Sequence, residues 1–429
     1  MGETGKGADE SDDSDESNSN SDKKRKGSRP QFARAADCAW GLFEPQGGRS
    51  GRDRTLEPEG VRPGVPERAS NGAARARPGI RTAAHADPPE LQAWLRNTDG
   101  TTGYAGILAD VQTVQYTDDH VWVSATGIPS YPIGPWPMNP NDATDQDYRV
   151  RIPRIPAEQT GAKTSTPLGR IGAFTNGVAI YNPLDAFSFQ NRGVWNQNAV
   201  VNEAPSFDSC LGHAPPNGEY HHHQNPVCLY TASSPQHSPL VGFAFDGYPI
   251  YGAYGYANTD GTGGIKRIES SYRDRDIAHR QTLTDGTALA PADWGPPVGS
   301  NTPPEQPLGT YVEDFEYVSG LGDLDEFNGR FAVTPEYPAG TYAYYATTNS
   351  DGSSAYPYIL GSEYRGIVDA ANFAPGQVAL DPGALTYTGP ATGIPVLPSR
   401  GSFLICVLLL AGLGLARSTG TRKPRNVGS

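Results

Sequence analysis

Glycine and proline recur so often in this chain that long helices are excluded. The 429 residues include 51 glycines and 39 prolines, together about 21% of the chain against an average of roughly 12%. Proline removes a backbone N–H donor and glycine adds backbone entropy, so both interrupt regular helices. The sequence therefore predicts short strands joined by many turns.

The acidic charge of the chain lies mainly in its middle part. The whole chain has 34 Lys and Arg and 47 Asp and Glu, for a net charge of −13, and residues 89–399 hold 14 basic and 32 acidic residues. Nucleic-acid affinity comes largely from Lys and Arg that release condensed counterions. We therefore expect no nucleic-acid partner.

The first 88 residues have a composition that cannot form a packed core. They begin with a run of Asp, Ser and Glu, continue with Lys23 to Lys26, and then contain Arg, Ala, Gly and Pro without a hydrophobic period. Such segments bury too little apolar surface to offset chain entropy. We expect residues 1–88 to be disordered, and we see no signal peptide in them. One hypothesis is that an upstream start codon adds sequence that the mature protein lacks.

Alternating apolar and polar residues dominate the segment that follows. Val111 to Tyr116, His120 to Ser124 and Thr341 to Thr347 show this period-2 pattern, which is typical of half-buried strands. The pattern predicts a mainly β fold with a single sandwich-like or barrel-like domain and short helices over residues 89–366. A Gly/Pro-rich linker is expected over 367–393.

The last segment, residues 394–429, contains an apolar run followed by basic residues. The run at 403–416 predicts one hydrophobic helix, although it is shorter than the about 20 residues that span a bilayer. A buried core helix is the alternative. The order of short motif, apolar helix and basic tail resembles bacterial tripartite sorting signals of the PEP-CTERM or IPTL-CTERM kind. That resemblance implies an exported protein of the cell envelope or exterior, anchored at least transiently in the membrane, with the inner-membrane sorting machinery as its partner.

Five of the eight histidines lie within 25 residues: His213, His221, His222, His223 and His237. If the segment around His222 is extended, His221 and His223 share a face and stand about 6.6 Å apart along the strand. Both rings can then reach a metal at about 2 Å. Pro215 to Gly218 are turn formers, so His213 can fold back toward this strand.

Several imidazoles that converge favour a transition metal, and we expect Cu or Zn. The candidate ligands are His213, His221 and His223, then His237, with His222 as a lesser candidate. Asp246 or Glu219 could add an oxygen ligand, and Asp246 could instead orient a histidine ring.

Three other interpretations of these histidines stay open. The site could belong to a metal-assisted hydrolase or a copper oxidase, with one coordination position open. The histidines could instead form a hydrogen-bonded network in a metal-free adhesion or scaffold domain. A run of three histidines can also simply be exposed.

The cysteines of the middle segment, Cys210 and Cys228, enclose His213 and the His221 to His223 run. In an oxidising compartment a disulfide between them would hold the loop. The alternative is a zinc site formed by Cys210, His213, His223 and Cys228, which a reducing compartment would favour.

Several ordered blocks in this segment resemble the YHYH domain. They are Cys210 to His213, Tyr220 to His223 with Pro226 and Cys228, His237 to Gly252, Leu324 to Pro338 and Tyr356 to Gly361. Two positions differ from the pattern: His222 stands where the family has Tyr, and Tyr131 stands where we expect His. The resemblance covers roughly residues 100 to 366 and implies the fold and export of the protein. It implies no activity, because the family has no assigned reaction.

Common catalytic motifs are absent from the sequence, and this narrows the enzyme classes to consider. The sequence has no nucleophile-elbow, phosphate-loop or His-Glu-x-x-His pattern, so it gives no support for the hydrolase and nucleotide-binding classes that use these motifs.

Asp323, Asp325 and Glu326 form an acidic group before a turn. We expect Asp325 or Glu326 to accept hydrogen bonds from turn amides or to pair with Arg330.

Overall fold

The computed structural model describes residues 87–299, 306–374 and 376–390, and over these residues the fold is mainly β, as predicted. The α-helices are single turns, α1 (Pro89–Gln92) and α2 (Ala199–Asn202). Six 3-10 turns accompany them: η1 (Tyr104–Gly106), η2 (Phe189–Asn191), η3 (Ala204–Ser206), η4 (Pro291–Asp293), η5 (Val312–Asp314) and η6 (Ala370–Phe373).

A seven-stranded sheet forms the centre of the domain, with the strand order β15–β16–β10–β9–β4–β5–β8. Its strands are β15 (Gly329–Ala332), β16 (Thr341–Tyr345), β10 (Pro249–Tyr251), β9 (Leu240–Ala244), β4 (Arg170–Phe174), β5 (Ala179–Tyr181) and β8 (His221–His222). The β10–β16 and β5–β8 pairs are parallel and the others are antiparallel.

A four-stranded antiparallel sheet has the order β17–β1–β2–β3, with β17 (Leu385–Thr386), β1 (Val111–Tyr116), β2 (His120–Ala125) and β3 (Tyr148–Pro153). Strand β17 comes from the segment that the sequence suggests as a linker, and Tyr387 beside it is buried. None of the described sheets closes into a barrel.

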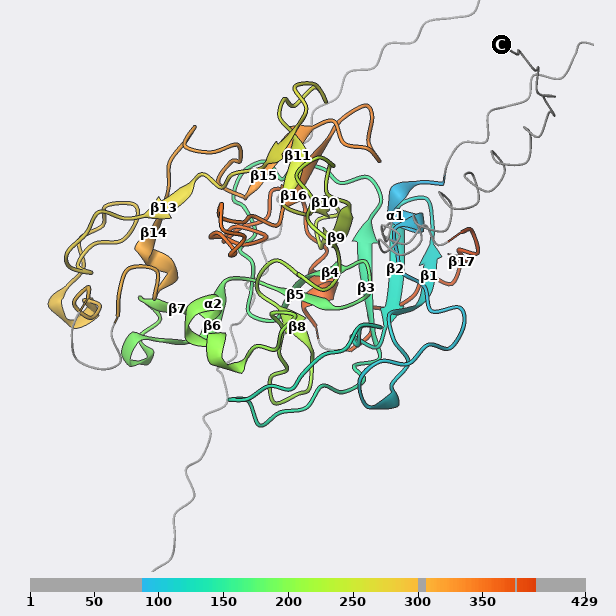
Figure 1. The fold of residues 1–429 in the computed structure, drawn as a ribbon, viewed down its shortest axis with the longest axis horizontal. Coiled ribbons are helices and arrows are strands. Elements are labelled where there is room, and N and C mark those ends of the chain that lie inside the picture. The colour runs from blue at the N-terminus through green and yellow to red at the C-terminus, as the bar shows by residue number, and fades with distance from the viewer. Residues whose placement is uncertain (1–86, 300–305, 375, 391–429) are drawn as a thin grey trace, which may run out of the picture. The chain divides into compact units, whose positions relative to one another are not determined.

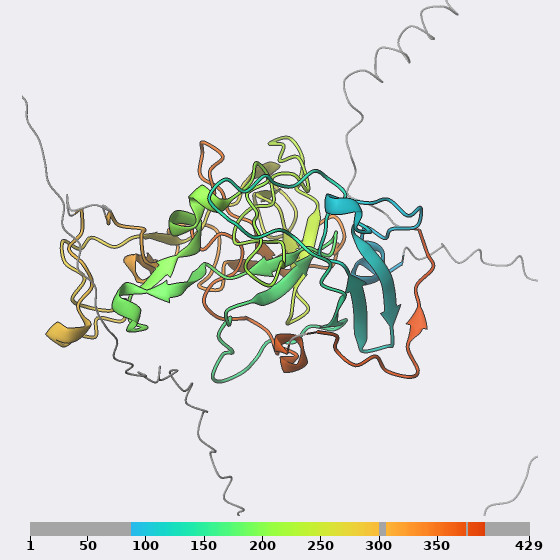
Figure 2. The same ribbon diagram turned by 90° about the horizontal axis from the view of Figure 1, so that it is seen from below.

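Three two-stranded ribbons complete the described fold. They are β6 (Leu184–Ser188) with β7 (Asn196–Asn198), β11 (Tyr254–Tyr256) with β12 (Ile265–Arg267), and β13 (Tyr272–Asp274) with β14 (Phe315–Tyr317). Figures 1 and 2 show the four-stranded sheet on one side of the seven-stranded sheet, with the β6–β7 and β13–β14 ribbons on the other side.

The central strand β9 explains why the two sheets share one core. All five of its residues are buried, as expected for a continuous apolar run flanked by strands on both sides. At Gly242 a Cβ would lie 2.7 Å from the Ala173 carbonyl oxygen, so only glycine permits this close strand pairing. The core cluster includes Phe243 of β9 together with Val123 of β2.

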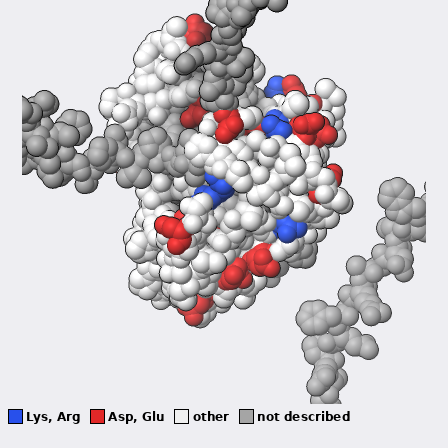
Figure 3. Space-filling model, turned by 90° about the vertical axis from the view of Figure 1, so that its right-hand side faces the viewer, with Lys and Arg blue, Asp and Glu red and all other residues white. Residues whose placement is uncertain are grey.

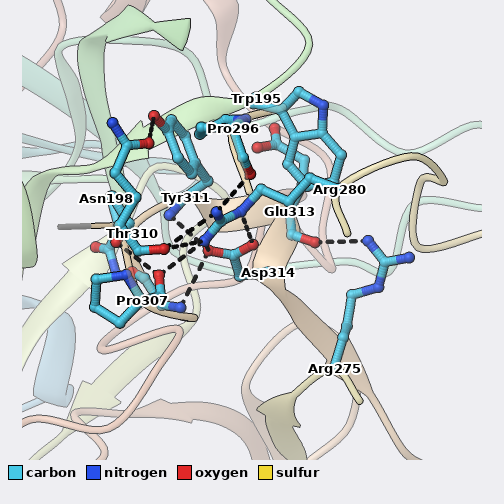
Figure 4. A network of polar contacts seen from close by, with 12 residues as sticks. Trp195, Asn198, Arg275, Arg280, Pro296, Pro307, Thr310, Tyr311, Glu313 and Asp314 are labelled. Carbon is cyan, nitrogen blue, oxygen red and sulfur yellow. Dashed lines mark hydrogen bonds and ion pairs between the residues drawn. The ribbon is translucent and has the colours of Figure 1, made fainter. Parts of the chain in front are cut away.

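A fully buried ion pair holds the long excursion between β13 and β14. The Arg280 guanidinium and the Asp314 carboxylate are both 0% exposed, with Nε to Oδ1 at 2.7 Å and Nη2 to Oδ2 at 2.8 Å. Figure 4 shows Arg280 also donating to the Pro296 and Pro307 carbonyls, while Asp314 accepts from the amide of Tyr311. The two charges are therefore paired and their remaining donors and acceptors are used.

The surface view in Figure 3 shows acidic and basic side chains in small, separate groups on a mainly uncharged face. Among the described residues, no helix is long and apolar enough to cross a membrane. Of residues 1–88, which the sequence predicts to be disordered, 1–86 lie outside the described residues, as does the hydrophobic helix expected at 403–416.

Candidate metal centre

Three histidines from two adjoining segments meet at the edge of the seven-stranded sheet. His221 opens β8, and its backbone pairs with that of His213, with N–O distances of 3.0 and 3.2 Å. The fold-back of His213 and the common face of His221 and His223 are both confirmed. All three residues are buried, at 6%, 2% and 3% exposure for His213, His221 and His223.

The Nε2 atoms of these rings point at one another. His221 Nε2 lies 3.1 Å from His213 Nε2 and 3.0 Å from His223 Nε2. The three ligand atoms all lie within 4.8 Å of one another. We call His213, His221 and His223 the histidine triad.

The other ring nitrogens fix the tautomers of the triad. His221 Nδ1 lies 2.9 Å from the Glu219 carbonyl oxygen and His223 Nδ1 lies 2.6 Å from that of Asn182. Carbonyl oxygens only accept hydrogen bonds, so both Nδ1 atoms carry the proton. His213 Nδ1 lies 2.7 Å from Ser206 Oγ, whose own hydrogen goes to the Glu203 carbonyl. In the neutral rings every Nε2 is therefore a bare lone pair.

Burial keeps His213 and His221 neutral. Desolvation lowers the pKa of His213 to about 4, and the same cause, reinforced by the neighbouring histidines, lowers the pKa of His221 well below its usual value. These two rings are thus uncharged at neutral pH, and their Nε2 lone pairs are available to a metal.

A carboxylate that no sequence motif marks, Glu203, borders the triad. Glu203 Oε2 lies 3.1 Å from His223 Nε2 and 3.4 Å from His213 Nε2, and it has no hydrogen-bond donor among the described residues. Burial first, and then the charge of Glu203, raise the pKa of Asp185 in β6. Neither carboxylate forms an ion pair with Lys or Arg within the described part of the chain.

Aromatic rings cover two sides of the triad. The Tyr181 ring stacks on His221 with the ring centroids 3.7 Å apart, and the Phe207 ring meets His213 edge-on at 4.8 Å. Tyr181 also donates from its hydroxyl to Glu219 Oε2 at 2.7 Å. Glu219, one predicted oxygen ligand, therefore turns its carboxylate to Tyr181 and Arg170 rather than to the triad.

The structure places the other two predicted ligands apart from the triad. His237 Nδ1 lies 2.7 Å from the Ser238 carbonyl oxygen, and its ring contacts Tyr251 and Tyr256. Asp246 accepts hydrogen bonds from the Tyr344 hydroxyl and the Gly366 amide. The triad thus gathers three of the five predicted metal ligands, without His237 and Asp246.

The predicted disulfide is present between Cys210 and Cys228, with an S–S distance of 2.07 Å. It closes the segment that carries all three triad histidines. Because the bridge removes both thiols, the alternative zinc site with two cysteine ligands is wrong for this structure. Asp208 supports the same loop by accepting hydrogen bonds from the amides of Cys210 and Gly212.

The acidic group at the later turn has a structural role. The Asp325 carboxylate accepts hydrogen bonds from the amides of Phe327 and Gly329, at 3.1 Å each, and from the Tyr342 hydroxyl. The predicted turn-amide contact is confirmed, whereas Arg330 instead donates to the Tyr256 carbonyl.

The two positions that depart from the YHYH pattern contact each other. His222 points away from the triad, with Nδ1 3.0 Å from the Leu211 carbonyl oxygen and Nε2 3.4 Å from the Tyr131 hydroxyl.

We predict that this pair tolerates exchange but not single replacement. Tyr131→His or His222→Tyr alone should lower the free energy of unfolding by about 1–3 kcal/mol, because a buried polar group loses its partner. The double exchange should recover most of that loss, which urea denaturation of the four proteins can measure. Additive losses in the double variant would show that the two side chains do not act as a pair.

The fold and the site define a class of protein: mainly β domains with a buried histidine triad enclosed by a disulfide. Residues 149–356 match the family model described as YHYH protein. The chain therefore contains a YHYH domain, and the predicted resemblance is confirmed. The match includes the triad, Glu203 and both bridged cysteines. No curated protein and no solved structure matches the chain.

Proposed function

We propose that the histidine triad binds one divalent transition metal ion, Zn(II) or Cu(II). The observation that carries the proposal is the set of three bare Nε2 lone pairs aimed at one another, with two separations of 3.0 and 3.1 Å. Metal–imidazole bonds of about 2.0–2.1 Å place two ligand nitrogens about 2.9–3.4 Å apart on one ion, for angles between 90° and tetrahedral. The triad separations fall in this range.

Electrostatics supports the same conclusion. Two buried acceptors at 3.0 Å repel each other unless a cation lies between them, and the Glu203 carboxylate, 3.1 Å from His223 Nε2, adds negative charge. A divalent ion would compensate this negative charge. The hydrogen bonds at Nδ1 would orient each ring and make its Nε2 a stronger ligand.

A metal-free network is the competing interpretation of the triad. It requires a proton between the Nε2 atoms, and burial opposes that proton because it lowers the pKa of both His213 and His221. The geometry therefore favours metal binding over an adhesion or scaffold domain in which the histidines only hydrogen-bond.

We propose further that the domain works outside the cytoplasm, in the cell envelope or beyond it. The Cys210–Cys228 disulfide supports this location, because such bridges persist in oxidising compartments. The sorting-signal resemblance of residues 394–429 points the same way, with transient membrane anchoring and delivery by the inner-membrane sorting machinery.

Metal removal tests the proposed function. The full-length protein, stripped with a chelator and dialysed, should melt at a lower temperature than the same protein after one equivalent of Zn(II) is added back. An ion bound 100-fold above its Kd stabilises the folded state by about 2.7 kcal/mol. Identical melting curves with and without Zn(II) and Cu(II), in differential scanning calorimetry, would contradict the proposal.

A further inference from the structure

We propose that Glu203 is the fourth protein ligand of the metal. The centre is then a closed site of three histidines and one glutamate, in which the ion holds two segments of the chain together and does not act on a substrate. This inference rests on the proposed metal binding and specifies the coordination and the role of the bound ion.

The carboxylate oxygen that faces the triad is buried without a donor. The Glu203 side chain is 25% exposed, but its Oε2 atom is fully buried and receives no hydrogen bond from the described residues. Glu203 also forms no ion pair with Lys or Arg in the described part of the chain. A buried carboxylate oxygen is unfavourable unless a donor or a positive charge lies against it. The atom therefore indicates a bound cation.

The distances from Glu203 to the triad fit donor atoms that share one ion. Glu203 Oε2 lies 3.1 Å from His223 Nε2 and 3.4 Å from His213 Nε2. Bonds of about 2.0–2.1 Å to nitrogen and about 2.0–2.2 Å to oxygen place two such donors about 2.8–3.5 Å apart, for angles between 90° and tetrahedral. Both distances fall in this range. In the neutral rings both nitrogens present lone pairs, so a cation between the three atoms removes their repulsion.

The backbone around Glu203 holds the carboxylate in this place. Glu203 lies between α2 and η3, and its amide donates to the Ala199 carbonyl at 2.8 Å. Its own carbonyl accepts a hydrogen bond from the Ser206 hydroxyl at 2.6 Å, and that hydroxyl lies 2.7 Å from His213 Nδ1. One short stretch of chain thus orients a triad ring and places a carboxylate beside it.

Four protein ligands and the covering side chains point to a structural role. The Tyr181 ring stacks on His221, the Phe207 ring packs edge-on against His213, and all three triad residues are buried. Structural zinc sites have four protein ligands, whereas catalytic sites have three and keep the fourth position for water or substrate. With Glu203 as a ligand, the ion joins the segment between α2 and η3 to β8.

The first test compares Zn(II) affinities of full-length proteins by competition titration against a chromophoric chelator. Glu203→Gln replaces the charged ligand by a neutral side chain of the same size, and it should bind Zn(II) at least about 10-fold more weakly than the wild type. Glu336→Gln is the matched control. Glu336 is also half-buried, but its carboxylate accepts a hydrogen bond from the Tyr251 hydroxyl at 2.8 Å. This variant should bind Zn(II) as the wild type does.

The second test asks directly whether the fourth position is filled. Co(II) binds the same kinds of ligand as Zn(II), and its visible spectrum changes when a further ligand enters the shell. Excess azide should leave the spectrum of the Co(II)-loaded wild type and of Glu336→Gln unchanged. It should change the spectrum of Glu203→Gln, in which the fourth position is open.

The outcomes separate this inference from the metal-binding proposal. A wild-type protein that does not retain Zn(II) contradicts the proposed function itself. If the wild type and Glu203→Gln retain Zn(II) equally tightly, Glu203 is not a ligand, although metal binding stands. A response of the Co(II)-loaded wild type to azide also overturns the inference, because it reveals an open position. That result comes from the wild type, so it holds even if the Glu203 variant does not fold.

Discussion

Replacing His221 by alanine is expected to lower the affinity of the protein for Zn(II) by at least about 100-fold. Removal of an outer partner of a metal ligand already costs about 10–100-fold, and His221 is the ring whose Nε2 is 3.1 and 3.0 Å from both other triad nitrogens. The measurement is a competition titration against a chromophoric chelator, with circular dichroism to verify that the variant folds.

His237→Gln is the matched control for this prediction. His237 is half-buried and, like His221, has its Nδ1 at hydrogen-bond distance from a backbone carbonyl oxygen, but its ring contacts Tyr251 and Tyr256 rather than the triad. Its variant should bind Zn(II) as the wild type does. An equal loss in both variants would mean that the metal does not sit in the triad.

Replacing Asp314 by alanine is expected to lower the free energy of unfolding by about 3–5 kcal/mol, because it leaves the Arg280 guanidinium buried without its counter-charge. Both side chains are 0% exposed, and Asp314 also accepts from the amides of Gly309 and Tyr311. Urea denaturation of the full-length protein measures the loss.

A more exposed ion pair, between strands β13 and β14 at the base of this excursion, provides the comparison. Arg273 and Glu316 pair at 2.9 Å with 57% and 32% side-chain exposure. Glu316→Ala should cost no more than about 1 kcal/mol, because solvent screens the pair. If Asp314→Ala costs as little as Glu316→Ala, the buried pair does not anchor the excursion.

The sequence predicted those parts of the site that depend on local geometry. Strand alternation places His221 and His223 on one face, and the turn residues before Glu219 return His213 to them. The disulfide between Cys210 and Cys228 closes this same short segment. Each of these features is set within about 20 residues of chain.

The parts that depend on sheet order could not be predicted from local patterns. Strand β9 lies near β8 in sequence, but β4 and β5 separate the two strands in the sheet. At about 4.8 Å per strand this places them about 14 Å apart. His237 and Asp246, which flank β9, therefore do not join the triad.

The carboxylate that borders the triad shows the same limit. Glu203 follows α2 and belongs to no motif that marks it as a neighbour of the histidines. Tertiary packing alone brings it to the triad. An acidic residue ten positions before His213 gave no signal that distinguished it from the other carboxylates of this acidic domain.

X-ray absorption spectroscopy at the zinc edge, on full-length protein loaded with one equivalent of Zn(II), identifies the atoms that bind the ion. We expect a first shell with three imidazole nitrogens at about 2.0–2.1 Å and at least one oxygen. A first shell made only of oxygens, or a single imidazole, would mean that the three rings do not hold the ion together.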